Sequence, residues 1–377
     1  MQKNQLPKET IKFLANKESD AEKAGIIHWY DDLSTNAPIA QNTVAKTKKR
    51  AKKKLMNSIN EKPKRVLNNY WLRIAAAAVL LIVGYFGWLQ YQKEEIPQLA
   101  SATQLAAIKP AQERAIITLE NGQEIDLDQL AINEQVHVGD IIIIKDSKGQ
   151  VSYINSKTGE PQMNSIRVPK ASIYTLALSD GSKVTLNSES KLSYPSQFEG
   201  QVRKVKLEGE AYFEIQKTAD HKQFIVETDL QEIEVLGTKF NIKAFDFDDE
   251  NFSTLAEGSV KVRNKESLKE GILKPGQQAF QQKGAEFSVK TVDVEKVLGW
   301  TNGQFIFDGD NNHDTFKEIG RWYDIEIEYQ QSLKIDQYLG KIPRNLPLDK
   351  LIDLLKYAEL TVEARVVKNN RIKLHIS

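Results

Sequence analysis

Apolar and polar positions divide this chain of 377 residues into segments with different periodicities. Residues 1–66 carry short apolar stripes at helical spacing, and residues 74–89 form an uncharged apolar run. Short alternating runs separated by glycine turns fill residues 114–292, and strand and helix patterns alternate over residues 298–377. This order predicts several regions with different folds.

The apolar run reads IAAAAVLLIVGYFGWL. With its flanks it reaches the length of about 20 residues that a helix needs to cross a hydrocarbon core. Tyr70 and Trp71 stand at one end and Trp88 and Tyr91 at the other, as amphipathic rings do at membrane interfaces. The run begins too far along the chain for a cleaved signal peptide. The sequence therefore predicts one transmembrane helix over residues 70–91.

Basic residues predict the orientation of this helix, because they are dense before it and sparse after it and stay on the cytoplasmic side. They include Lys48, Lys49, Arg50, Lys52, Lys53, Lys54 and Arg65. We therefore expect a single-pass protein of the inner membrane with a cytoplasmic N-terminus and a periplasmic C-terminus. The basic run also suits contact with inner-membrane lipid. No recognition helix or zinc pattern accompanies it, so we expect no direct nucleic-acid binding.

The segment 1–66 is predicted to hold a helix pair. The run Ser19–Glu22 reads S-x-x-E, which is a capping box that marks a helix start. The apolar stripe consists of Phe13, Leu14, Ile26, Ile27, Trp29, Tyr30 and Leu33. So few apolar residues do not close a core by themselves. The stripe is therefore either a membrane-surface element or a docking face for a partner, and we favour the partner.

After a polar linker over residues 92–113, residues 114–292 predict an all-β domain. Residues 116–127 read as a hairpin around Asn121–Gly122, and residues 174–186 read as a second hairpin around Asp180–Gly181. Many short strands with glycine turns indicate a sandwich, a barrel or a solenoid. The expected form is solenoid- or sandwich-like.

Residues 298–377 predict a small α+β domain. Helical patterns cover residues 313–323 and 348–357, and strand patterns cover residues 304–307, 325–329, 338–342, 360–366 and 371–376. This order is typical of a two-layer arrangement of a sheet and helices.

Composition and motifs argue against catalysis. The formal net charge of +1 favours no particular partner, and the absence of cysteine excludes disulfides, thiolate metal sites and cysteine nucleophiles. The run from Asp308 to Asp314 resembles the start of a calcium loop, but His313 stands where an EF-hand needs glycine. Glu208, Glu210 and Glu214 read as exposed strand carboxylates. We therefore expect no catalytic residues, no metal and no cofactor.

Several blocks of the chain resemble FecR-type anti-sigma factors. The blocks are LSDGSKVTLNSESKLSYPSQF (178–198), RKVKLEGEAYFEI (203–215), VLGTKFNIKA (235–244), LAEGSVKV (255–262) and LKPGQ (273–277). Residues 300–307, 320–323 and 346–355 are similar to the C-terminal domain of Bacteroidota-type members, which is similar to the short N-terminal domain of secretins and TonB-dependent receptors. The helix pair before residue 33 is similar to the sigma-binding segment of the family. Family members often carry proline-arginine-glycine where this chain has Pro169–Ala171.

The resemblance implies a signal relay. It implies that residues 1–66 bind an extracytoplasmic-function sigma factor. It also implies that the outer region receives a signal from the signalling domain of an outer-membrane TonB-dependent transporter, with a membrane protease as a further partner. Two alternatives stay open. One is a membrane-anchored periplasmic glycan-binding protein or enzyme, which leaves the helix pair without a role, and the other is a membrane-tethered transcription factor.

Overall fold

The computed structural model describes most of the chain from residue 98 onward. The described residues are 98–138, 141–145, 151–155, 161–309, 312–330 and 338–377 and, before these, 21, 24–25, 28, 49–54, 56–57, 80–85 and 87–88. The chain divides into two compact units, Met1–Lys93 and Glu94–Ser377. The elements described below all belong to the second unit.

Two sheets pack around one core to form a β-sandwich. Sheet 1 contains, in spatial order, β18 (Glu270–Leu273), β17 (Val260–Asn264), β14 (Gln231–Val235), β13 (Gln223–Glu227), the first half of β12 (Val202–Glu214), β11 (Ser190–Pro195), β8 (Met163–Val168), β3 (Ile116–Thr118) and β4 (Glu124–Asp126). Sheet 2 contains β2 (Gln112–Glu113), β9 (Ser172–Ala177), β10 (Lys183–Leu186), the second half of β12, β15 (Lys239–Ala244), β16 (Glu250–Glu257), β19 (Gln277–Gln282) and β20 (Ser288–Thr291). Both sheets contribute buried side chains to the same apolar cluster. The arrangement is therefore a sandwich.

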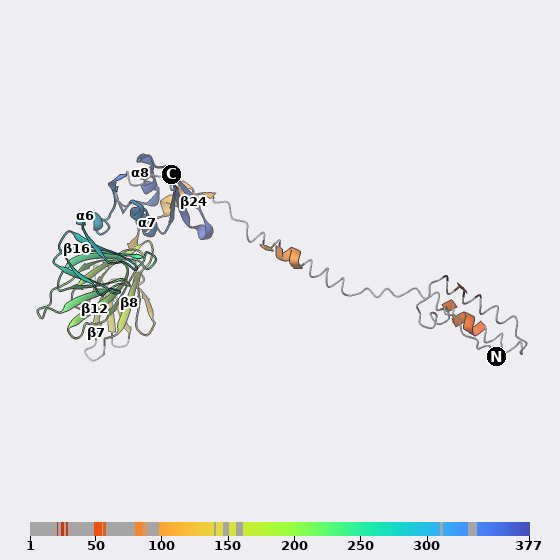
Figure 1. Cartoon of the computed structure of the whole chain (residues 1–377), viewed down its shortest axis with the longest axis horizontal. Coiled ribbons are helices and arrows are strands. Elements are labelled where there is room, and N and C mark those ends of the chain that lie inside the picture. Colours follow the sequence, from red (N-terminus) through yellow and green to blue (C-terminus); the bar gives the residue numbers. More distant parts are fainter. Residues whose placement is uncertain are drawn as a thin grey trace, which may run out of the picture. The chain divides into compact units, whose positions relative to one another are not determined.

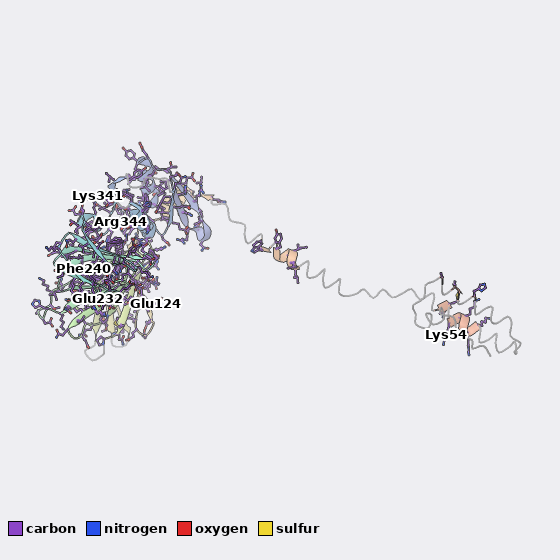
Figure 2. All side chains as sticks on the ribbon, viewed as in Figure 1. Lys54, Glu124, Glu232, Phe240, Lys341 and Arg344 are labelled. Carbon is purple, nitrogen blue, oxygen red and sulfur yellow. The ribbon has the colours of Figure 1, made fainter. Side chains whose placement is uncertain are left out.

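Period-two patterning explains this core. In β9 and β11 every second residue is buried, because successive side chains of a strand point to opposite faces. The stacked rings of Phe213 and Phe240 lie 4.9 Å apart within sheet 2, and Phe213 also meets Phe224 of sheet 1 edge-on at 6.4 Å. These contacts join the two layers. Figure 2 labels Phe240 in the larger lobe.

Strand β12 belongs to both sheets, and Gly209 lies where it passes from one to the other. Before Gly209 the strand pairs with β11 and β13, and from Gly209 onward it pairs with β10 and β15. Gly209 has a φ of +106°, and a Cβ placed there would lie 2.6 Å from the Cα of Ser190. Glycine is required at this bend, because any other residue would be strained and would overlap the neighbouring strand.

A separate meander follows β4. It consists of β5 (Gln135–Val138), β6 (Ile141–Lys145) and β7 (Val151–Asn155), all antiparallel. The Nζ atom of Lys145 donates to the carbonyl groups of Leu127 and Leu130, which fixes the base of the meander against the preceding loop.

The C-terminal domain forms a second core. Its elements are α6 (Val294–Val297), β21 (Gln304–Asp308), α7 (Asn312–Tyr323), β22 (Glu326–Tyr329), β23 (Leu339–Pro343), α8 (Leu348–Tyr357), β24 (Val362–Val366), a 3₁₀ turn (Lys368–Asn370) and β25 (Ile372–Ile376). Strand β25 pairs in parallel with β22 and antiparallel with β24, and β21 pairs with β23. Helices α7 and α8 bury one apolar face each against this layer. Figure 1 shows α7, α8 and β24 together in one lobe.

The range 92–113, expected as a linker, contributes to this second core. Strand β1 (Gln98–Leu99) pairs with β24, and α5 (Ala102–Ala107) contacts α8. In Figure 1 this orange segment lies among the blue elements of the C-terminal domain. Ser101 caps α5 with a capping box, and Leu105 and Ile108 pack against the buried cluster. The sequence of this segment was interpreted as a polar linker because only one face of so short a helix is apolar.

The prediction of a transmembrane helix over residues 70–91, and with it the inner-membrane location, is wrong on this structure. Of that range only residues 80–85 and 87–88 are described. Within the described part of the chain, no helix has the length and apolar character that a membrane crossing requires. The fold class is corrected accordingly, because the described residues form mostly sheet with few helices.

Candidate functional site

The predicted partner-binding residues cannot be located in this structure. Phe13, Leu14, Ile26, Ile27, Trp29, Tyr30 and Leu33 lie outside the described residues, as do Lys48 and Arg65. Lys49, Arg50, Lys52, Lys53 and Lys54 are described as helical and exposed, and Figure 2 labels Lys54. The site described below therefore comes from the second unit alone.

A polar surface lies on the outer face of sheet 2, where β12 and β15 are neighbours. Glu210 is opposite Lys243, and their side chains point away from the core because Ala211 and Ile242 beside them point into it. Glu210 is nevertheless only 5% exposed. Its carboxylate accepts hydrogen bonds from the amides of Asn187 at 2.9 Å and Asn241 at 3.1 Å. A buried carboxylate is thus held by neutral donors.

The C-terminal domain covers this surface. The indole Nε1 of Trp300 donates to Oδ1 of Asn241 at 3.1 Å, and Trp300 is only 4% exposed. The Nζ of Lys243 donates to Asp314 of α7 at 2.8 Å. Burial raises the pKa of Asp314, but the charge and hydrogen bond of Lys243 lower it further, so that the net pKa is below its usual value. The Trp300–Asn241–Glu210 chain therefore joins the two cores through polar contacts.

Two arginines of the C-terminal domain, Arg321 and Arg344, are buried, and Arg321 lies at this junction. The guanidinium of Arg321 lies 4.2 Å from the ring centre of Phe245, and its backbone carbonyl accepts from the N–H of Ala171 at 2.8 Å. Burial lowers the pKa of Arg321, and nearby carboxylates, Glu210 first, oppose this shift. Arg344, labelled in Figure 2, lies between the rings of Phe305 and Trp322.

Arg344 differs from Arg321 in its polar partners. Its guanidinium pairs with the carboxylate of Glu318 and donates to the carbonyl of Gln304. Burial also lowers the pKa of Arg344. Arg344 is therefore a structural cation whose charge is compensated, because it has both an ion-pair partner and two aromatic neighbours.

A cavity of about 450 Å³ opens between the polar surface and the C-terminal domain. Its walls come from β12, β15, β16, β19 and β20 on one side and from α6, β21 and α7 on the other. Hydrogen-bonding side chains dominate the walls, with Phe252 and Ile306 as apolar patches. Among the described residues no group of His, Cys, Asp or Glu is arranged to hold a metal ion. The arrangement suits binding of a polar molecule.

Sequence reasoning treated Glu208, Glu210 and Glu214 alike, and for Glu210 the interpretation as an exposed carboxylate is wrong. Glu208 and Glu214 are half-buried, whereas Glu210 is buried. Alternation along β12 correctly points Glu210 away from the sandwich core. The pattern contains no signal that another domain covers that outer face, because the covering residues lie about 100 positions further along the chain.

The loop before α7 carries a different arrangement from a calcium loop. Oδ1 of Asn312 accepts from the N–H groups of Asp308 and Gly309, and Nδ2 donates to the carbonyl of Tyr338 at 2.8 Å. Asp314 pairs with Lys243 instead of turning into the loop. Residues 310–311 of this loop lie outside the described residues.

Comparisons with known proteins agree with the order of the two cores. Two crystal structures of a proposed anti-sigma factor from Parabacteroides distasonis are similar to the chain at 27% identity, covering 56% of it. The similarity extends over 98% and 97% of those chains, with TM-scores of 0.49 and 0.48. No curated protein matches the chain. Residues 164–261 match the family described as FecR protein, and residues 304–374 match the family described as FecR, C-terminal. The resemblance to FecR-type anti-sigma factors is thereby confirmed over these two ranges of the chain.

Proposed function

We propose that this protein is an anti-sigma factor, a regulatory protein that acts by binding a sigma factor. The observation that carries the proposal is the pair of family matches, with the FecR region at 164–261 followed by the FecR C-terminal region at 304–374. The similarity of these two ranges to the FecR family supports a regulatory role over an enzymatic one. The polar surface agrees with this, because its carboxylates Glu210 and Asp314 are already engaged by side chains of the protein.

The sigma-binding element in this proposal is the N-terminal segment 1–66, and its partner is an extracytoplasmic-function sigma factor. The apolar stripe that includes Trp29 and Tyr30 supports this assignment, because an amphipathic helix without a core of its own gains stability by docking on a partner. The division of the chain into Met1–Lys93 and Glu94–Ser377 also suits separate tasks of binding and signal reception.

The signal input in this proposal is the second unit, and its partner is the signalling domain of a TonB-dependent transporter. Sheet and helix surfaces of the β-sandwich and C-terminal domain offer the area for such a contact. A binding experiment with the two units measured separately tests this input. A purified signalling domain is expected to bind Glu94–Ser377 and not Met1–Lys93.

The test of sigma binding is co-purification of the full chain from its native cell, as wild type, Trp29→Ala and His28→Ala. His28 is the matched control, because it adjoins Trp29 and is exposed. A central tryptophan in an interface commonly contributes about 2 kcal/mol or more, so we expect Trp29→Ala to reduce sigma recovery at least about tenfold. His28→Ala should recover as much sigma factor as the wild type.

Two other outcomes would count against the proposal in different ways. Equal recovery with Trp29→Ala would show that the stripe is not the docking face. Failure of the wild type to recover any sigma factor would remove the anti-sigma function itself.

A further inference from the structure

The cavity beneath the C-terminal domain is lined by a buried arginine that has no side-chain ion pair in the described part of the chain. Arg321 of α7 is only 6% exposed, and it lines the cavity together with Glu210 and Thr315. Its Nε atom is buried and has no hydrogen-bond partner among the described residues. Within that same part of the chain no carboxylate lies at ion-pair distance from its guanidinium. A buried charge in this state is costly, so an acceptor is expected.

Two other cations of the cavity and its buried carboxylate are already engaged. Lys243 pairs with Asp314 at 2.8 Å, and Lys296 lies 3.9 Å from Asp308. Glu210 accepts from two amides, as described above. Lys290 also lines the cavity but is exposed, so Arg321 is the buried cation whose charge is available to a molecule entering the cavity.

The size and the walls of the cavity restrict the class of ligand. A volume of about 450 Å³ lies within the range that holds small molecules. A planar guanidinium group can donate two parallel hydrogen bonds to the two oxygens of one carboxylate. Phe252 and Ile306 provide apolar wall for a carbon skeleton, while Gln278 and Gln304 provide further polar contacts.

We propose that this cavity binds a small organic acid whose carboxylate is received by Arg321. Bound there, the acid contacts both the β-sandwich and the C-terminal domain, and it strengthens their association. This site goes beyond the proposed binding of a sigma factor and does not depend on it, since its residues all belong to the second unit.

The test is isothermal titration calorimetry of the full chain with acetate, succinate and citrate, with inorganic phosphate as the competing anion. At least one of the carboxylates should bind at one site per chain and more tightly than phosphate. Arg321→Gln should weaken this binding at least tenfold, and Arg321→Lys should weaken it less, because the lysine keeps the charge but loses the fork. Arg365→Gln is the matched control, because Arg365 is exposed and lies outside the cavity.

A second variant separates loss of binding from loss of folding. Lys290 is an exposed residue that lines the cavity, so Lys290→Glu should keep the fold and weaken carboxylate binding through repulsion. The proposal is overturned if none of the three carboxylates binds the wild type, if phosphate binds more tightly than all of them, or if Arg321→Gln and Lys290→Glu both bind like the wild type. Sigma recovery by the same variants would stay unchanged in any of these cases.

Discussion

At the scale of single residues, Gly209 decides whether β12 can serve two sheets. Its backbone lies in a region that glycine tolerates and other residues do not, and Ser190 leaves no space for a side chain. The bend at this point also brings Glu210 beside Asn187 and Asn241. One glycine thus supports both the sandwich core and the polar surface on its outside.

We predict that Gly209→Ala lowers the free energy of unfolding by about 3 kcal/mol, from backbone strain combined with overlap against Ser190. Gly122→Ala is the control, because Gly122 also has a positive φ, +83°, but its Cβ would meet no atom within 4 Å. Gly122→Ala should lower the free energy of unfolding by about 1 kcal/mol. Urea unfolding of the two variants measures the difference, and equal losses would show that the approach of Ser190 does not matter.

The residue scale is also where the sequence was least informative. Arg203 illustrates this. Its side chain is charged, and yet it lies on the core-facing side of β12 and is only 1% exposed. Its guanidinium pairs with Asp180 at 2.6 Å and donates to the carbonyls of Gln216 and Lys222. These partners come from separate turns that meet only after the sheets have packed. The local pattern of apolar and polar residues does not predict which distant groups will pair with a buried charge.

At the scale of elements, α7 is attached to sheet 2 by ion pairs. Asp314 in its first turn pairs with Lys243 of β15, and Lys317 one turn later lies 3.2 Å from Asp248. Lys243 and Asp314 have side chains that are 19% and 28% exposed, so solvent screens their attraction only in part. Of the two ion pairs, the Lys243–Asp314 pair is the shorter and the one with the less exposed cation.

We predict that Asp314→Asn lowers the free energy of unfolding by about 1–2 kcal/mol at neutral pH. The folded pKa of Asp314 lies below the ordinary pKa of an aspartate, so the stabilisation is present above that ordinary pKa and disappears as the pH falls through the folded pKa. The difference between wild type and variant should therefore shrink in acid. Unfolding curves at several pH values measure it.

Asp353→Asn is the matched control for this prediction. Asp353 pairs with Lys350 on the surface of α8, where the two side chains are 64% and 58% exposed. Such an exposed pair contributes little, so its loss should change stability by less than about 0.5 kcal/mol. An Asp314→Asn effect that persists unchanged at low pH would contradict the role of the charge.

Elements were the most predictable level of this structure. The hairpin expected over residues 174–186 is confirmed as β9 and β10, with Asp180–Gly181 at the turn and Gly181 at a φ of +83°. The helices expected over residues 313–323 and 348–357 are confirmed as α7 and α8. Pairings between distant strands, such as β3 with β8, were not predictable, because strand periodicity contains no information about the neighbour.

At the scale of the whole molecule, the C-terminal domain is completed by a segment from the beginning of the second unit. The N–H of Ala100 donates to the carbonyl of Ala364 at 2.8 Å, and the N–H of Leu348 donates to the carbonyl of Ile108 at 3.1 Å. The β-sandwich therefore forms an insertion between two parts of one domain. The sequence pattern suggested separate consecutive domains, because a short strand and a short helix contribute too little periodicity to be assigned.

We predict that a chain beginning at Glu94 keeps the stability of the second unit, whereas a chain beginning at Gln112 loses about 2–4 kcal/mol from the C-terminal domain. The loss comes from removing the apolar contacts of Leu105 and Ile108 with its core. Urea unfolding followed by tryptophan fluorescence measures this, because Trp322 lies in that core. Equal stability of the two truncated chains would show that β1 and α5 contact the C-terminal domain without stabilising it.

The return of β1 to the C-terminal domain also has a mechanical consequence. Tension that reaches the second unit through the preceding chain falls first on β1, which has only two residues. Its pairings, Gln98 with Val366 and Leu99 with Arg365, can open one after the other, so little force is needed at each step. The β-sandwich lies beyond α5 along the chain and is shielded from that load. A pull on the N-terminal side would thus loosen the C-terminal domain while leaving the larger core intact.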